Sequence, residues 1–253
     1  AAPDCTANIA CLPYQGVYQI FDIDPELFDL SGQSTTLTPD DSDPNGYTLV
    51  TSSVSAFTVT PGSSATTTTL ALTNWGDFEE HALGTMGGFE LYGRTYTSIF
   101  VGGEGYVTFG GGDTRTLFAE EDFYRFPRVC GVCADLDPES GTVTVDETAT
   151  SVAITFEGVS VGGFGSIDFQ IVLYATGVVE ITWLNVPTAT FSDRDMVFVG
   201  IGPGVGSLPY PGERDFFVPP PENCGNGADD DGDGLIDCDD SGCFADPTHC
   251  TTE

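Results

Sequence analysis

The sequence predicts an all-β fold, an antiparallel β-sandwich of the jelly-roll-like type, followed by a small C-terminal module of different composition. Short runs of β-branched and aromatic residues, separated by Gly, Pro, Asp or Asn, follow one another along residues 31–202. No stretch has the spacing of an amphipathic helix of useful length. Short strands at this spacing are typical of a sandwich or barrel. A chain of 253 residues has room for one large β-domain and a small appendage.

The predicted β-domain, 31–202, begins with a polar stretch over 31–46 that ends in a turn-forming cluster of Asp, Pro, Asn and Gly. The expected strands then lie at 47–51, 54–60, 66–73, 95–101, 106–109, 142–146, 152–156, 168–174, 178–183 and 196–201. Threonine-rich residues 63–69 have two interpretations. They begin the strand at 66–73, or they carry O-linked sugar.

Residues 1–30 are expected to form an N-terminal arm that holds one further strand. Its apolar, strand-prone side chains are Val17, Tyr18, Ile20, Phe21 and Ile23. A polar stretch separates them from the main run of strands. Such a strand can complete the sheet of another copy by strand addition, or it can pair within its own domain. The sequence leaves both alternatives open.

The C-terminal part differs from the β-domain in composition. Residues 203–221 are rich in Pro and Gly and end in three consecutive prolines, which predicts a stiff linker. Residues 222–253 form the predicted module, and nine of the 39 acidic residues of the chain lie in 224–253 without an arginine. A piece this small cannot rely on a hydrophobic core and needs a metal and disulfides.

The charge of the chain excludes several classes of partner. The formal net charge is −33, and the six basic residues are all arginine: Arg94, Arg115, Arg125, Arg128, Arg194 and Arg214. Nucleic acid is excluded, since nothing neutralises a run of phosphates, and an anionic membrane surface is disfavoured. No apolar run is long enough for a membrane-spanning helix. The absence of lysine excludes Schiff-base chemistry and phosphate binding by a P-loop. The charge favours divalent cations.

Eight cysteines occur in local pairs: Cys5, Cys11, Cys130, Cys133, Cys224, Cys238, Cys243 and Cys250. An even number in such pairs predicts disulfides and an oxidising compartment, hence a secreted or cell-surface protein. Ala1-Ala2-Pro3 resembles what small-residue signal cleavage leaves. We expect the pairs Cys5–Cys11 and Cys130–Cys133, with the last four cysteines holding the tail. The alternatives are a metal site formed by thiolates and, for Cys130–Cys133, a redox motif.

The strongest chemical signal is a run of aspartates near the C-terminus. Carboxylates fall at positions 1, 3, 5, 9 and 12 of a twelve-residue loop, glycine at position 6 and an apolar residue at position 7. These residues are Asp229, Asp231, Asp233, Gly234, Leu235, Asp237 and Asp240. Ca²⁺ prefers six to eight oxygen ligands at flexible geometry, and this spacing gathers them around one point. The alternative is a solvated acidic tail.

Residues 222–243 also resemble the thrombospondin type 3-like and dockerin-like calcium repeats of secreted bacterial proteins. The resemblance implies Ca²⁺ held by the five aspartates of the loop, with Asp237 binding directly or through water, and by the carbonyl of Leu235. It adds Asn226 as a further candidate ligand. A dockerin has two such loops and this chain shows one, so binding of a cohesin is not implied.

A second resemblance covers roughly residues 70–202. The segments 89–101, 105–110, 134–138 and 169–174 are similar to the nidogen-like (NIDO-like) β-domains of extracellular matrix and bacterial surface proteins. Such domains are adhesive or architectural, and no catalytic residue carries over. Where the family has Asn-Gly in the hairpin before the Tyr-x-x-Phe strand, this chain has Glu104-Gly105, and the glycine still permits a left-handed turn.

The sequence offers little for catalysis, and we expect no enzyme. His81 is the only plausible histidine base in the β-domain, and no G-x-S-x-G elbow accompanies it. The carboxylate pairs of a glycosidase would be found in Glu120-Glu121-Asp122 or in Asp135 and Asp137. The latter two alternate at a strand end, where a second calcium or plain solvation is expected.

Two function hypotheses of different classes remain, with a glycan-active hydrolase as a remote third. The first is a secreted subunit that assembles with copies of itself into a filament or surface layer stabilised by Ca²⁺ and disulfides. The second is an adhesion module that does not polymerise and binds a surface glycan or matrix protein. The strand-prone arm favours the first, as does the absence of the lysines that often protect sheet edges.

Overall fold

The structure is a computed structural model that describes residues 16–21, 28–40, 42, 46–74, 76–115, 120–161, 165–186, 197–204, 213–217, 224–227, 236, 238, 243 and 250. The chain divides into two compact units, Ala1–Phe216 and Phe217–Glu253. The boundary between them falls inside the predicted linker 203–221. In the described part, no helix is long and apolar enough to cross a membrane.

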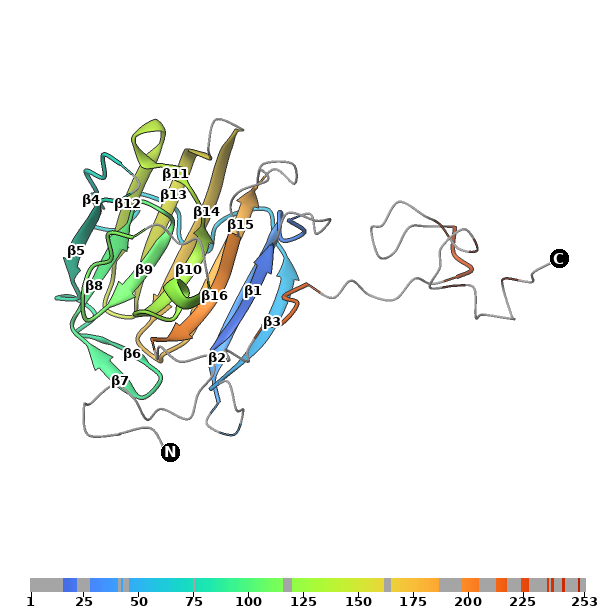
Figure 1. The fold of residues 1–253 in the computed structure, drawn as a ribbon, viewed down its shortest axis with the longest axis horizontal. Coiled ribbons are helices and arrows are strands. Elements are labelled where there is room, and N and C mark those ends of the chain that lie inside the picture. The colour runs from blue at the N-terminus through green and yellow to red at the C-terminus, as the bar shows by residue number, and fades with distance from the viewer. Residues whose placement is uncertain are drawn as a thin grey trace. The chain divides into compact units, whose positions relative to one another are not determined.

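The first unit is a sandwich of two antiparallel sheets, as predicted (Figure 1). The first sheet has the order β1 (Val17–Phe21), β16 (Val197–Pro203), β10 (Pro127–Cys133), β9 (Tyr106–Phe109), β8 (Ser98–Gly102) and β5 (Phe78–Ala82). The second sheet has the order β3 (Tyr47–Ser53), β2 (Gln33–Pro39), β15 (Val179–Asn185), β14 (Ser166–Tyr174), β13 (Ser151–Val161), β12 (Thr142–Glu147) and β4 (Thr68–Thr69). Strands β12 to β15 are neighbours in chain order in the second sheet, whereas in the first sheet β1 and β10 both pair with β16 from the far end of the chain.

The smaller elements complete this unit. Strand β11 (Leu136–Asp137) pairs with β13, and β6 (Phe89–Leu91) forms a hairpin with β7 (Arg94–Tyr96). The helical segments are the four-residue α1 (Glu120–Phe123) and the three-residue η2 (Pro138–Ser140). The described residues thus hold no long helix, as the sequence predicts.

The core lies between the two sheets. Phe156 and Phe169 stack with ring centroids 4.6 Å apart on the second sheet, and Trp183 on β15 is fully buried beside them. The Trp183 Nε1–H donates to the carbonyl oxygen of Gly131 on β10 at 2.7 Å, which joins the two sheets. A side chain at position 131 would collide with the ring of Phe169, so this glycine permits the close approach. Truncating such a buried aromatic residue to alanine costs about 3–5 kcal/mol.

The N-terminal strand pairs within its own chain. Val17, Tyr18, Ile20 and Phe21 lie on β1, which is antiparallel to β16 with Val17 opposite Ile201. They are buried. Their burial explains the pairing, because an apolar strand gains most where both faces are covered. Of the two alternatives, this structure shows residues 17–21 paired within their own domain, and Ile23 lies outside the described residues.

Part of the predicted linker covers the remaining edge of β1. Glu213 forms a parallel bridge to Tyr18, and the Arg214 N–H donates to the Tyr18 carbonyl at 2.8 Å. The Phe216 N–H donates to Gln19 Oε1 at 2.9 Å, and the Phe216 ring is buried. These contacts cover the outer edge of β1 at Tyr18.

The prediction of a strand at 54–60 is wrong, and the contacts of this segment explain why. This segment crosses the outer face of the second sheet instead of joining it. The Gln170 side chain on β14 bonds both backbone groups of Val59, accepting from its N–H at 3.1 Å and donating to its carbonyl at 2.7 Å. A glutamine amide carries the same donor and acceptor as a peptide group. The segment therefore obtains the hydrogen bonds of a strand neighbour without a neighbouring strand.

Gly105, by contrast, has the predicted left-handed conformation. Its φ is +81°, and its N–H donates to the Gly102 carbonyl in the turn between β8 and β9. A side chain here would also meet the backbone of Val132. Glycine is therefore required twice, for the turn and for the approach of β10.

Candidate functional site

The predicted calcium ligands lie mostly outside the described residues. This applies to Asp229, Asp231, Asp233, Leu235, Asp237 and Asp240. Asn226 is described and lies exposed in the turn 224–227. Among the described residues, no group of three or more His, Cys, Asp or Glu side chains could hold a metal ion.

Two disulfides enclose the aspartate run. Cys224 bonds Cys243 across 19 residues, and Cys238 bonds Cys250 across 12. The two rings overlap, because Cys238 lies inside the first ring and Cys250 beyond it. All six loop ligands, from Asp229 to Asp240, lie between Cys224 and Cys243 in the sequence. The expectation that the last four cysteines hold the tail is confirmed.

The donor set suits a hard cation. Every candidate ligand in the ring presents oxygen, from carboxylates, a backbone carbonyl or the Asn226 amide. The four cysteines of this unit are in disulfides and offer no thiolate. Oxygen-only ligands select Ca²⁺ or Mg²⁺, and the number of carboxylates favours Ca²⁺. A ring of this size lowers the entropy of the unfolded chain by the equivalent of about 3 kcal/mol.

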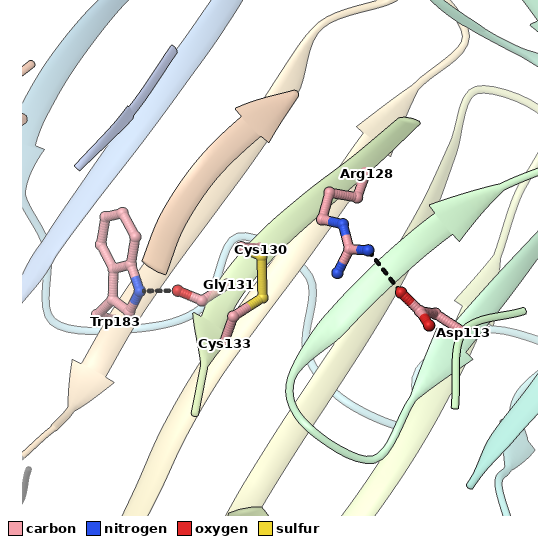
Figure 2. Close-up of a disulfide and its surroundings, with 6 residues drawn as sticks. All are labelled: Asp113, Arg128, Cys130, Gly131, Cys133 and Trp183. Atoms are coloured by element: carbon pink, nitrogen blue, oxygen red, sulfur yellow. Dashed lines mark hydrogen bonds and ion pairs between the residues drawn. A yellow bond between two sulfur atoms is a disulfide. The ribbon is translucent and has the colours of Figure 1, made fainter. Parts of the chain in front are cut away.

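The predicted Cys130–Cys133 disulfide is present, and it lies within strand β10. Both cysteines are fully buried. Cys130 lies opposite Gly200 and Cys133 opposite Phe198, so β10 has one extra residue here and the ladder is shifted. The disulfide spans this bulge, and the Gly131 carbonyl inside it accepts the bond from Trp183 (Figure 2). A buried disulfide that closes a bulge is structural, whereas a redox pair needs an accessible sulfur.

A buried ion pair lies beside this disulfide. Arg128 precedes Cys130 on β10, and its Nη2 donates to Asp113 Oδ2 at 2.7 Å (Figure 2). Neither side chain is accessible to solvent. Arg125 adds a second bond to Asp113 at 3.0 Å and is one-third exposed. The Tyr106 hydroxyl donates to the Asp113 carbonyl at 2.5 Å, and its ring lies 5.2 Å from the Arg128 guanidinium carbon.

This cluster belongs to a second apolar layer on the outer face of the first sheet. Tyr106, Cys130 and Phe198 lie on that face, and Phe123 and Tyr124 of the α1 region cover them. Burial lowers the pKa of the Arg128 guanidinium, and Asp113 acts in the opposite direction. Burial also raises the pKa of the Tyr106 phenol. Sequence reasoning missed this pair, and the available signal was an arginine directly before an apolar Val-Cys run.

His81 pairs with a nearly buried carboxylate in this fold. It lies on β5, and its Nε2 is 3.2 Å from Glu147 Oε2. The other oxygen of Glu147 accepts from the backbone N–H groups of Thr85 and Met86. The side chains of His81 and Glu147 are only 14% and 5% exposed. The partner of the candidate base is thus a carboxylate that holds a turn, not a hydroxyl or thiol nucleophile.

The neighbouring carboxylate, Asp146, holds the threonine-rich loop. It accepts from the N–H groups of Gly62 and Ser64 and from the Thr67 hydroxyl. The hydroxyls of Ser64 and Thr66 donate to the Glu147 carbonyl. Three hydroxyls of this loop are therefore engaged in the fold, and only 68–69 form a strand, β4. The predicted strand at 66–73 is too long.

The other acidic candidates are Asp135, Asp137 and residues 120–122. Asp135 and Asp137 are exposed on either side of buried Leu136. No third ligand joins them among the described residues. Asp122 lies on α1, and the side chains of Glu120 and Glu121 lie outside the described part.

Comparison of the chain with models of known protein families, with curated proteins and with solved structures found no match.

Proposed function

We propose that this chain is a secreted structural subunit that assembles with copies of itself, and that Ca²⁺ folds its C-terminal unit. The observation that carries the proposal is the pair of overlapping disulfides around the aspartate run. A solvated acidic tail needs no covalent enclosure. A cation-binding loop benefits from one, because mutual repulsion of its carboxylates opposes folding until an ion binds.

The residues of the ring have distinct tasks in this proposal. Asp229, Asp231, Asp233 and Asp240 supply carboxylates, and the Leu235 carbonyl supplies a neutral oxygen. Bound Ca²⁺ would neutralise part of their charge and so permit a compact loop. Extracellular calcium modules work at about 10⁻⁴–10⁻³ M Ca²⁺, which suits a protein whose disulfides indicate an oxidising compartment.

The β-sandwich has the properties of a durable building block. Its core is closed, and its buried carboxylates at Asp113, Asp146 and Glu147 hold loops or an arginine rather than a reactive partner. The large negative charge keeps copies apart at low ionic strength. Calcium bound to the second unit would lower that repulsion and promote contact.

Light scattering and electron microscopy of the full chain, with Ca²⁺ and with a chelator, test the proposal. We expect ordered assemblies with Ca²⁺ and dispersal after chelation. The double variant Asp231→Asn with Asp233→Asn should remain dispersed in Ca²⁺. Its charge-matched control, Asp137→Asn with Glu139→Gln on the exposed surface of the sandwich, should assemble like the unchanged chain. A monomer at every calcium level that binds a glycan or matrix protein would replace the proposal with the adhesion module.

A further inference from the structure

The loop 110–115, which follows β9, lies among aromatic rings. It begins with three consecutive glycines, and one ring lies next to each of them. In the order of the glycines, these rings belong to Tyr96, Phe126 and Phe78. Phe78 is 37% exposed, and the other two rings are half-buried. Because glycine adds no side chain, the loop leaves the rings accessible to a binding partner.

Most of the described arginines lie at the same loop. Four of the five are found here: Arg94, Arg115, Arg125 and Arg128. The guanidinium carbon of Arg94 lies 5.8 Å from the centre of the Tyr96 ring, and that of Arg125 lies 5.4 Å from the centre of the Phe126 ring. Two of the three rings are therefore accompanied by a cation.

Two of these arginines are available to a partner. Asp113 forms ion pairs with Arg125 and Arg128, and it also accepts the backbone N–H of Arg115 at 3.2 Å. By contrast, the guanidinium groups of Arg94 and Arg115 form no ion pair with a carboxylate in the part of the chain that the structure describes. Arg115 is exposed and Arg94 is half-buried. The loop, its three rings and the three accessible arginines together form the arginine surface: Phe78, Tyr96, Phe126, Arg94, Arg115 and Arg125.

The second sheet differs from this surface in charge. Its strands contain no arginine and carry five acidic residues, Asp146, Glu147, Glu157, Asp168 and Glu180. Acidic side chains also occur near the arginine surface, as with Glu80 opposite Phe100, but in the described residues arginines gather only there. In a chain with a net charge of −33, a second copy is therefore attracted to the arginine surface more than to other parts of the sandwich.

We propose that the arginine surface binds an acidic surface of a second copy, head to tail. This inference deepens the proposed function by naming a contact between subunits, and it rests on that function. Two arginine surfaces would repel each other, so a symmetric pairing of this surface with itself is disfavoured. A contact between two different surfaces repeats from copy to copy and forms a ring or an open filament. Arginine and aromatic residues are also enriched in the centres of protein interfaces.

The double variant Arg94→Gln with Arg115→Gln tests the contact in the full chain with Ca²⁺. Since neither side chain pairs with a carboxylate in the described fold, its melting temperature should be unchanged. Its self-association, measured by sedimentation velocity, should weaken by about tenfold or more. The matched control, Thr38→Glu with Thr60→Glu on exposed residues, changes the net charge by the same amount and should assemble as well as the unchanged chain.

Mixing the chains distinguishes a head-to-tail contact from a symmetric one. The glutamine variant keeps its acidic surfaces, so it can bind an unchanged copy but offers no arginine surface to the next one. A small fraction of this variant should therefore shorten the assemblies of the unchanged chain in electron micrographs. The same fraction of the control variant should leave their length unchanged.

The outcomes separate this contact from the proposed function. If the glutamine variant assembles in Ca²⁺ like the unchanged chain, the contact is wrong and the proposed function stands. If the glutamine variant alone loses assembly, but the unchanged chain assembles equally in Ca²⁺ and in chelator, the contact holds and the role of calcium fails. Loss of assembly in both double variants would show a general effect of charge and would overturn the contact. So would an unchanged chain that stays monomeric and uses these arginines to bind an acidic polysaccharide.

Discussion

The two units of this chain are stabilised by different forces. In the sandwich, apolar side chains from both sheets fill a continuous core. In the described residues of Phe217–Glu253, the only buried hydrophobic side chain is Cys243, which is in a disulfide. A unit of this size cannot gain enough from apolar burial to fold. The comparison contrasts a part held by a hydrophobic core with a part held by disulfides, for which we propose an ion as the further source of order.

Among the changes that test this comparison, a substitution of Asp113 should have the largest effect on stability. Asp113→Asn leaves Arg128 buried without its counter-charge, which should lower the free energy of unfolding of the sandwich by about 3–5 kcal/mol. Urea denaturation followed by far-UV circular dichroism measures it.

The matched control for this change is Asp137→Asn, on an exposed residue, which should change stability by less than about 0.5 kcal/mol. Calcium affinity should be unchanged in both variants. Equal stabilities of the two variants would show that the buried ion pair does not stabilise the sandwich.

The second-largest effect is expected when the disulfides of the two units are removed separately. Replacing Cys224 and Cys243 by serine opens a ring of 19 residues and should destabilise the second unit by about 3 kcal/mol. Replacing Cys130 and Cys133 opens a ring of three and should cost the sandwich about 2 kcal/mol.

Each pair of serine variants should affect its own unit alone, and limited proteolysis with mass spectrometry shows which unit becomes susceptible. Cleavage within 1–216 after the Cys224 and Cys243 changes would contradict the independence of the two units.

The smallest effect concerns alkaline pH. Burial raises the pKa of Tyr92, Tyr106 and Tyr174 above their ordinary value of 10. Their neutral forms therefore stabilise the fold fully below pH 10, and this contribution is lost as the pH rises beyond it.

Above pH 10, we expect the melting temperature of the sandwich to fall by about 2–4 °C for each 1 kcal/mol decrease in the free energy of unfolding. In the Tyr106→Phe variant, the melting temperature should fall less steeply with rising pH. Residues 217–253 contain no tyrosine, so a parallel alkaline transition in that unit would contradict this assignment. Calorimetry between pH 9 and 11 provides the measurement.

Much of the sandwich could be predicted because its strands follow simple patterns. Strand β9 lies where predicted, at 106–109, and β12 to β16 differ from their predicted ranges mainly at the ends. These strands have β-branched and aromatic residues bounded by turn formers. Their burial between two sheets agrees with that pattern.

The missed strands depend on tertiary contacts that the sequence does not show. Strand β2 is polar, yet Ser34 bonds Thr182 and Thr35 bonds Thr51 through hydroxyl groups across its neighbours. Strand β10 contains Pro127 and Arg128 and is buried on both faces after its first residue, so it has no alternating pattern. Polar groups that are satisfied by distant partners look like loop residues in a sequence.

The candidate sites also include one that was predicted from the sequence and one that was not. The calcium loop was predicted because its ligands are local in sequence, and the prediction stays open. The Arg128–Asp113 pair was missed, because 15 residues separate its members and the sequence pattern marks only the arginine.

Hydrogen exchange of the full chain with and without Ca²⁺ tests the central claim most directly. We predict that Ca²⁺ slows the exchange of amides in 226–243 by at least tenfold and leaves the strands of the sandwich unchanged. Identical exchange of 226–243 in Ca²⁺ and in chelator would contradict the claim that an ion folds the second unit.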